Sequence, residues 1–276
     1  MRAFLLLLAG CSSYAADATS TVLREAERAA LHEPDVELAR AALPAGIVQL
    51  DAFAHAYPAH REFAAMHAES ECRFAVAFVF DDWEAASFTG HAGDASAIAD
   101  RLQPLLERCI ADSARVIGWD RRGAPSIDRA TAPAAISIAE AMSIEVAVAP
   151  LAHLGELPSI EAIAKRCADV APGTRDAGAE QLLGTLAAAK AQPLGGDDGE
   201  DAFARARALA PHALMIDVML ARGVAVARGD RAMFEAALHR VLDVDASRWP
   251  EQRLANELAR VKARRYLAAE SQLFAR

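Results

Sequence analysis

Two histidines and several glutamates lie close together in the sequence, and such side chains are potential metal ligands. His60 and His67 are seven residues apart, with Glu62, Glu69 and Glu71 nearby. Zinc sites on a single helix use motifs such as His-Glu-x-x-His, which this sequence lacks. Histidines at this spacing share a helix face without completing a tetrahedral ligand set. We therefore predict a solvated helix face here, with neither a metal nor another cofactor.

A second group of charged side chains surrounds Trp83. Asp81, Asp82 and Glu84 follow the most apolar segment of the first half of the chain. If a solute passed there, they would form an acidic mouth beside an aromatic ring and would select solutes by charge. We favour a simpler interpretation, in which the carboxylates are the solvated end of a helix and Trp83 packs on the core.

Two further charged clusters have structural explanations. The first is acidic and precedes a helix, where carboxylates cap free backbone N–H groups and suit the positive end of the helix dipole. The second is basic, and we favour a solvated outer helix face over a docking surface for an acidic partner or phospholipid headgroups. The acidic cluster is Asp197, Asp198, Glu200 and Asp201, and the basic cluster is Arg260, Lys262, Arg264 and Arg265.

Motifs of catalysis and of phosphate binding are missing from the sequence. It contains no Gly-Lys-Ser/Thr loop, no Gly-x-Ser-x-Gly elbow and no Cys-x-x-Cys pair. The net charge is −9, with acidic residues spread along the chain. Binding of nucleic acid needs a cationic face. We therefore predict neither an enzyme nor a nucleic-acid-binding protein.

Cys11 lies at the end of a segment with the pattern of a lipoprotein signal. A positive residue and an apolar run at residues 3–9 lead to Leu-Ala-Gly directly before Cys11. The run is far shorter than the roughly 20 apolar residues that span a bilayer. We predict a cleaved signal peptide at residues 1–10, a lipid on Cys11 and a flexible lipidated tether at residues 11–21.

Export has consequences for location and for the other thiols. Because Ser12 is not acidic, we expect the lipid to anchor the protein in the outer rather than the inner membrane, facing the periplasm, with no other membrane contact. Cys72, Cys109 and Cys167 remain. In an oxidising compartment one pair could form a disulfide and leave one thiol over. We expect instead that all three are buried free cysteines in helices.

Helices must position these side chains, because apolar residues recur at the helical period and no long run alternates at period two. The chain is 54% hydrophobic but only 6% aromatic, which favours helices packed at close range. We expect one domain at residues 22–276, with a possible seam at 115–133, where the longest irregular connection lies. Apolar stripes predict helices over residues 36–53, 63–79, 98–110 and 136–149, the second ending at the acidic cluster.

The C-terminal half repeats itself. The spacing is typical of tetratricopeptide-type hairpins, in which a first helix ends at a glycine turn and a second helix carries Phe and Ala. We predict an all-α fold of tetratricopeptide-like helical hairpin repeats, an α-solenoid, with a C-terminal capping helix over residues 250–274. Leu182, Leu186, Lys190, Gly196 and Asp197 recur 33 residues later as Met215, Met219, Gly223, Gly229 and Asp230, and Phe203 and Ala206 recur 31 residues later as Phe234 and Ala237.

Several stretches of this half carry a family resemblance. They are Gln-Leu-Leu-Gly-Thr-Leu-Ala-Ala-Ala-Lys at residues 181–190, Leu-Gly-Gly-Asp at 194–197, Ala202 with Phe203, and Pro-Glu-Gln-Arg-Leu-Ala-Asn at 250–256. With these motifs the chain resembles the TRAP transporter T-component (TatT) family, periplasmic lipoproteins associated with tripartite ATP-independent uptake systems. The resemblance covers most of the mature chain and is closest toward the C-terminus.

The resemblance implies a partner and an assembly. It implies a homotrimer of helical-repeat protomers, each with a channel, that docks a TRAP-type periplasmic solute-binding protein. We predict that alanine-rich helices line an apolar ligand passage. The alternative is a general tetratricopeptide-like scaffold for protein–protein interactions in the cell envelope. The residues predicted to line the passage are Phe74, Phe78, Trp83, Ile136, Ile138 and Met142.

Overall fold

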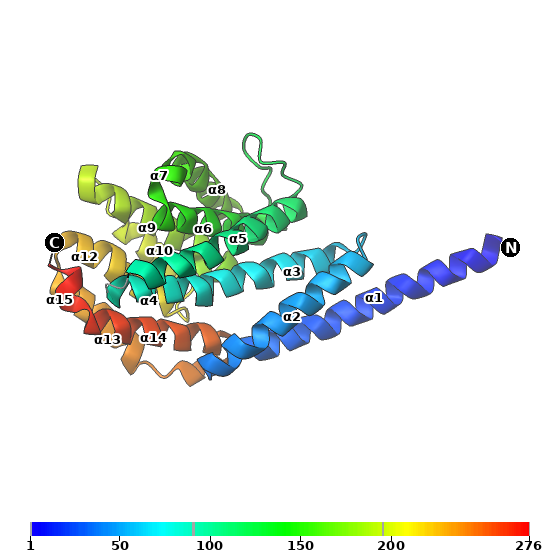
Figure 1. The fold of residues 1–276 in the computed structure, drawn as a ribbon, viewed down its shortest axis with the longest axis horizontal. Helices are drawn as coiled ribbons and strands as arrows, with labels where there is room; N and C mark the ends of the chain where they lie inside the picture. The colour runs from blue at the N-terminus through cyan, green and yellow to red at the C-terminus, as the bar shows by residue number, and fades with distance from the viewer. Residues whose placement is uncertain (1, 90–91, 195, 276) are drawn as a thin grey trace.

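The computed structural model describes the backbone of residues 2–89, 92–194 and 196–275, and it describes side chains outside residues 1–14, 89–92, 192–195 and 276. Within these ranges the chain is helical throughout, with turns between the helices and no β-strand. Helices that follow one another along the chain pack against each other as pairs (Figure 1). The predicted all-α class is confirmed.

The first half of the chain forms long helices that lie side by side. α3 continues without a break through a π-helical turn into α4, and an irregular connection over residues 118–131 separates α5 from α6. The elements are α1 (Arg2–Leu31), α2 (Val36–Ala56), α3 (Arg61–Phe74), η1 (Ala75–Val79), α4 (Phe80–Thr89), α5 (Ala92–Ile117), α6 (Ala132–Val148), α7 (Pro150–His153), η2 (Leu154–Glu156) and α8 (Leu157–Val170).

The second half consists of shorter helices. The elements are α9 (Thr174–Leu194), α10 (Glu200–Leu209), α11 (Met215–Leu220), η3 (Ala221–Ala225), α12 (Val226–Arg228), α13 (Arg231–Asp243), η4 (Ala246–Arg248), η5 (Pro250–Gln252), α14 (Arg253–Ala268) and α15 (Glu270–Leu273). In Figure 1, α13, α14 and α15 lie along the lower left of the molecule, and α1 and α2 extend to its lower edge from the right.

The helix predicted to end at the acidic cluster continues past it. Residues 63–79 belong to α3 and η1, and the backbone stays helical into α4, where Asp81, Asp82 and Glu84 lie in the first turns. No Gly or Pro interrupts this segment, and basic residues of α2 and α14 compensate the charges of the carboxylates. The prediction of a solvated helix end at this point is wrong.

The segment predicted as a flexible tether is helical. Residues 11–21 lie within α1, which runs to Leu31. From residue 15 onward its side chains pack on α3 mainly by polar contacts. Ser20 and Arg24 both donate hydrogen bonds to Glu62, at 3.0 and 2.8 Å. The side chain of Cys11 lies outside the described residues, so its lipidation stays a prediction.

The hairpins of the second half bury equivalent residues. Phe203 and Phe234 are both fully buried, and each comes early in the second helix of a pair. Gly229, with φ of 69°, ends α12, and Asp230 caps α13 by accepting a hydrogen bond from the backbone N–H of Met233 at 2.9 Å. The Gly-Asp pair therefore makes the turn that the sequence pattern predicts.

Helix α14 is more than a cap on an exposed end. Its Leu254 and Leu258 belong to the main core, which α2 to α9 build, whereas Ala259, Ala263 and Tyr266 belong to a second core with α11 and α13. It also contacts α1 and α2. The small and apolar residues of α14 therefore contact both cores, and the helix packs the C-terminal part of the chain against its N-terminal helices.

Candidate functional site

The acidic cluster and the basic cluster, far apart in sequence, meet in the structure. Lys262 on α14 lies 3.0 Å from Asp81 and 2.7 Å from Glu84 on α4. Arg265, one turn further, donates hydrogen bonds to Asp81 at 3.1 Å and to Glu84 at 3.3 Å. Tyr266 donates to Glu84 at 2.6 Å. We call this group the α4–α14 ion cluster.

In the α4–α14 ion cluster, basic neighbours compensate the charge of Asp81 although its side chain is buried. Burial alone would raise the pKa of Asp81, but the hydrogen bond from Arg265 and the charge of Lys262 outweigh it, and the pKa lies below its usual value. Burial also raises the pKa of the Tyr266 hydroxyl well above 10.0, with Glu84 adding to the effect. Asp81 therefore stays ionised, and this part of the basic cluster is neither a solvated face nor free for an acidic partner.

The other members of these two clusters have separate roles. Asp82 lies 2.7 Å from Arg40 of α2, whose guanidinium is over the ring of Phe78 at 5.0 Å. Arg260 donates hydrogen bonds to backbone carbonyls at the C-terminal end of α13, including that of Val244. Arg264 remains exposed. Neither an acidic mouth nor a continuous basic docking face is formed by these residues.

The second acidic cluster caps a helix in part. The carboxylate of Asp198 accepts a hydrogen bond from the backbone N–H of Glu200 at 3.3 Å, as predicted. Asp198 and Glu200 also pair with Arg228, from the end of α12. The cluster therefore links two successive hairpins as well as beginning α10.

The residues predicted to line a passage gather in the main core. Phe74 and Phe78 come from α3 and η1, with ring centroids 5.5 Å apart. Ile136, Ile138 and Met142 come from α6 and are at most 4% exposed. Trp83 is half-buried at the edge of this core and stacks on Phe80, with centroids 5.5 Å apart.

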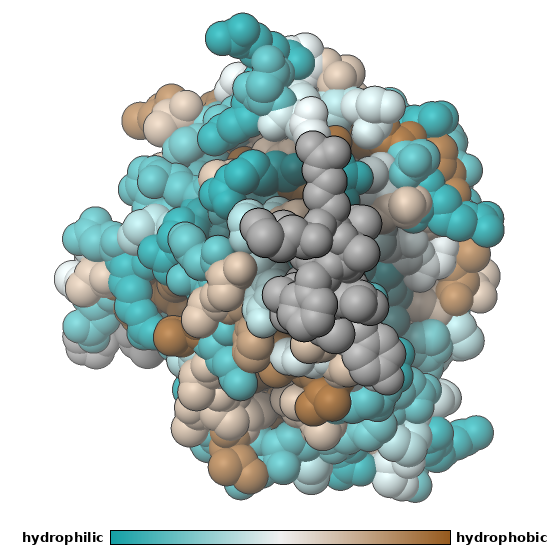
Figure 2. Space-filling view, turned by 90° about the vertical axis from the view of Figure 1, so that its right-hand side faces the viewer, coloured by the Kyte–Doolittle hydropathy of each residue, from teal (hydrophilic) through white to brown (hydrophobic). Residues whose placement is uncertain are grey.

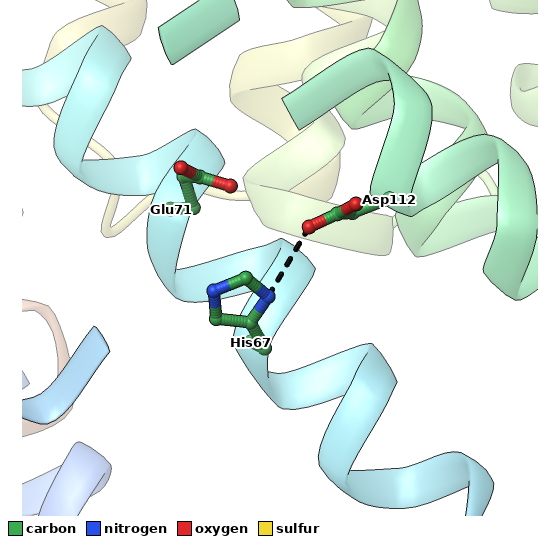
Figure 3. A group of neighbouring side chains, drawn as sticks. All are labelled: His67, Glu71 and Asp112. Carbon is green, nitrogen blue, oxygen red and sulfur yellow. Dashed lines mark ion pairs between the residues drawn. The ribbon is translucent and has the colours of Figure 1, made fainter. Parts of the chain in front are cut away.

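The two histidines of the first half are paired rather than solvated, which corrects the prediction. The side chains of His60 and His67 are only 16% and 13% exposed. His60 lies 2.9 Å from Asp17 of α1. His67 points from α3 toward Asp112 on α5, with Nδ1 3.2 Å from its carboxylate, and Glu71 lies one turn further along α3 (Figure 3).

A disulfide holds α3 and α5 together next to this histidine. Cys72 and Cys109 are bonded, with their Cα atoms 4.9 Å apart, and Cys167 is a buried free thiol. The expectation of three free thiols is therefore wrong for two of them. Helices α3 and α5 pack side by side, which brings these two residues into bonding distance, and burial raises the pKa of Cys167 to about 11.

Ion pairs lie close to the disulfide along α3 and α5. Arg108 lies 2.6 Å from Glu71, and Arg115 lies 2.5 Å from Asp112. The hydrogen bond to Asp112 raises the pKa of His67 despite burial, and neighbouring carboxylates add to the effect. We call His67, Glu71, Asp112 and the two arginines the α3–α5 ion ladder.

A second cluster of one histidine and two carboxylates lies at the end of α6. Nδ1 of His153 is 3.9 Å from Glu145 and 3.3 Å from Glu156. The side chain of Glu145 is 6% exposed. Burial raises its pKa, and the nearby charge of Glu156 raises it further. Sequence reasoning missed this cluster, although His153 and Glu156 are three residues apart next to a proline-started turn.

The first turn of α9 is left-handed, which the sequence did not indicate. Arg175, Asp176 and Ala177 have φ of 50°, 57° and 59°. Such a turn costs about 1–2 kcal/mol per residue and persists only where its surroundings hold it. Here Arg175 lies 3.1 Å from Glu140 of α6, and Asp176 accepts a hydrogen bond from Gln252 at 3.0 Å. The turn thus ties α6 and α9 to the segment before α14.

Within the described residues, none of the helices combines the length and the apolar character needed to cross a bilayer. No curated protein matches the chain significantly. The sequence profile of the TRAP transporter T-component family matches residues 32–129 and 127–274, which together cover both halves of the fold and meet in the irregular connection before α6. This is a family of transporter components and not of enzymes. The chain belongs to the TRAP transporter T-component family.

Proposed function

We propose that this chain is a lipid-anchored, periplasm-facing accessory of a TRAP-type uptake system, which docks a periplasmic solute-binding protein and offers its ligand an apolar passage. The observation that carries the proposal is the family match over both halves of the chain. The signal-like residues 1–10 and Cys11 support an outer-membrane anchor. The successive helical pairs, with equivalent phenylalanines buried in the second half, support a tetratricopeptide-like repeat.

The composition of the main core supports an apolar ligand. Helix α6 is buried on nearly all sides and consists largely of alanine and isoleucine, so a route beside it would present few hydrogen-bonding groups. We propose that the route runs beside α6 where α3 packs on it, close to the π-helical segment η1 that continues α3. Such π-helical turns are frequent at functional sites. Trp83, at the edge of this core, would lie at its opening.

The surface does not single out one docking face for the solute-binding protein. The exposed large apolar residues are spread over α1, α2, the α7 region, α10 and α14, for example Val22, Val48 and Leu151. Figure 2 views the end of the molecule from which α1 begins, and hydrophilic residues there are interspersed with hydrophobic ones without a single large patch. Assembly into a trimer, which the family resemblance implies, would decide which of these residues stay free.

A binding experiment tests the docking role. The unlipidated Cys11→Ser protein is mixed with the TRAP-type solute-binding proteins of the same genome, and complexes are measured by sedimentation velocity at micromolar concentration. We expect the chain alone to sediment as a trimer and to bind one of these proteins. Absence of any complex at that concentration contradicts the transport role, and capture of envelope-assembly proteins instead supports the scaffold alternative.

A second experiment tests the passage independently of docking. Met142→Trp adds volume beside the proposed route, whereas Val48→Trp adds the same ring on a side chain that is 71% exposed. We expect Met142→Trp to weaken binding of the apolar fluorophore N-phenyl-1-naphthylamine at least fivefold and Val48→Trp to leave it unchanged. Equal binding by both variants, with helicity intact by circular dichroism, contradicts a passage at this place.

A further inference from the structure

Within the part of the chain that the structure describes, two clusters place one imidazole and two carboxylates close enough for a shared metal ion. One is His67, Glu71 and Asp112, and the other is Glu145, His153 and Glu156, and in each the ligand atoms lie within 4.8 Å of one another. Each also has a glutamate oxygen that is buried without a hydrogen-bond partner among the described residues, on Glu71 and on Glu156. Proximity alone therefore does not show which cluster could bind a metal ion. The two clusters differ in the basic side chains that pair with their carboxylates.

In the α3–α5 ion ladder each carboxylate already has a cation. Arg108 lies 2.6 Å from Glu71, and Arg115 lies 2.5 Å from the oxygen of Asp112 that His67 does not contact. A divalent ion would have to displace these arginines from buried or half-buried carboxylates. This cluster is therefore explained as a set of ion pairs, two across the α3–α5 interface and one within α5.

The Glu145 cluster has no such compensation within the described part of the chain. Glu145 is 94% buried, and among the described residues it receives no hydrogen bond and its only ion-pair partner is the imidazole of His153, 3.9 Å away. Among the described side chains, Glu156 pairs with His153 and with no arginine or lysine. Among the surrounding charges, Arg121 and Glu107 act on Glu145 only through space and oppose each other. Two carboxylates and one histidine thus form a buried negative site that a cation would neutralise.

The distances suit a small ion with nitrogen and oxygen ligands. In a tetrahedral zinc site the bond lengths of about 2.0–2.2 Å place ligand atoms about 3.3 Å apart. His153 Nδ1 and Glu156 Oε1 are 3.3 Å apart, and His153 Nδ1 and Glu145 Oε2 would need to approach from 3.9 Å. The side chains of His153 and Glu156 are 20% and 29% exposed, so water can complete the coordination and an ion can enter.

We propose that Glu145, His153 and Glu156 form a divalent metal site selective for Zn²⁺, which fastens the short α7–η2 segment to the end of α6. An imidazole with two carboxylates favours Zn²⁺ over Mg²⁺ and Ca²⁺, which take oxygen ligands only. The ion would hold a segment that otherwise has little core contact, since Leu151 in α7 is 97% exposed. The site lies at the edge of the molecule, beside α7 in Figure 1, and does not depend on the proposed transport role.

Zinc titration of the full chain tests this site. The experiment uses untagged Cys11→Ser protein, because the thiol of Cys11 could itself bind Zn²⁺. The protein is stripped of metal with EDTA, dialysed and titrated with Zn²⁺ by calorimetry. We expect one ion per chain and a higher Tm with Zn²⁺. Glu145→Gln and His153→Asn should each weaken binding at least tenfold. The matched control is Asp112→Asn, which alters the α3–α5 ion ladder and should keep the affinity of the parent protein.

The stability of the metal-free proteins distinguishes a metal-binding role of Glu145 from a purely structural one. Without metal, Glu145→Gln should fold as stably as the parent protein or more stably, because it removes an uncompensated buried charge, yet it should lose the gain in Tm with Zn²⁺. The proposal is overturned by loss of binding in Asp112→Asn with retention in Glu145→Gln. It is equally overturned if no saturable binding occurs at micromolar Zn²⁺, or if Mg²⁺ or Ca²⁺ binds as tightly.

Discussion

At the scale of single residues, a tight approach of two helices in the second half depends on two glycines beside a phenylalanine. A Cβ atom on Gly184 would lie 2.8 Å from the ring of Phe203, and one on Gly199 would lie 2.2 Å from the carbonyl oxygen of Gly184. Gly199 also has φ of 84°. The absence of side chains at these two positions therefore lets α9 and α10 approach each other.

Alanine at these glycines should destabilise the protein. We expect Gly184→Ala to lower the free energy of unfolding by about 1–3 kcal/mol, because the ring of Phe203 is fully buried and cannot move away freely. Gly199→Ala should cost more, since it adds backbone strain to the clash. Gly46→Ala in α2, where nothing lies within 4 Å of the added Cβ, should be neutral or stabilising. Urea unfolding measures all three, and equal effects at Gly184 and Gly46 would contradict the close approach.

His67 should make stability depend on pH in a definite direction. Its pKa in the folded protein is raised above 6.5 by Asp112, with further contributions from Glu71 and Asp51. A raised histidine pKa means that the folded state binds the proton more tightly, so this stabilisation is complete below about pH 6.5 and is lost as the pH rises through the folded-state pKa.

The measurement compares urea unfolding of the parent protein and of His67→Gln between pH 5.5 and 9. We expect the difference in free energy of unfolding between the two to shrink as the pH rises. The exposed His239, changed to Gln, serves as the control and should show a constant difference. A constant difference for His67→Gln as well would show that its proton does not contribute to stability.

At the scale of elements, the α4–α14 ion cluster determines how α14 packs on the first half of the chain. Its members are 178 to 184 residues apart in sequence. Asp81 is 5% exposed, and Lys262 and Arg265 are mostly buried beside it. Removing one member of such a group leaves partly uncompensated buried charge, which is more costly than losing a surface ion pair.

We therefore expect Asp81→Asn to lower the free energy of unfolding by about 3 kcal/mol at neutral pH. The exposed pair of Arg28 and Glu25 provides the control, and Arg28→Gln should change stability by less than about 0.5 kcal/mol. Because the pKa of Asp81 is lowered, its contribution is present above about pH 3.9 and is lost as the pH falls through the folded-state pKa. Chemical denaturation at neutral and acid pH tests both statements, and an Asp81→Asn effect as small as that of Arg28→Gln would refute them.

At the scale of the whole molecule, α14 contributes side chains to two cores, and we expect it to couple their unfolding. Leu258 packs in the main core, and Ala263, little more than one turn later, packs in the C-terminal core. We expect Leu258→Ala and Ala263→Leu each to destabilise the whole chain, by about 2–5 and 1–3 kcal/mol. The exposed Val261, changed to Ala, should have little effect.

Tryptophan fluorescence distinguishes the cores, because Trp83 packs on the main core and Trp249 on the C-terminal core. Single-tryptophan variants that retain one or the other should unfold at the same urea concentration in the parent protein. Both transitions should shift together in Leu258→Ala. A shift of the Trp83 transition alone would mean that the cores unfold independently and that α14 does not couple them.

Much of the architecture was predictable because it depends on short-range patterns. The helical period of the apolar residues predicts the all-α class, and Gly229 with Asp230 predicts a helix-ending turn that the structure confirms. Phe203 and Phe234 recur in the sequence and are buried in equivalent helices. The motifs of the C-terminal half also predicted the family that the profile confirms.

What only the tertiary structure decided is which distant residues meet. The sequence offered three cysteines without a preferred pair, and the packing of α3 on α5 selected Cys72 and Cys109. The sequence predicted solvated acidic and basic clusters around Asp81 and Lys262, and the packing of α14 on the first half brought these two residues into an ion pair. Helical periods and caps depend on neighbours a few residues away, whereas charge compensation depends on which helices distant in sequence pack against each other. For that reason the sequence by itself determined the helices, their turns and the family, and the fold determined which charges are neutralised and which, as at Glu145, are left without a partner.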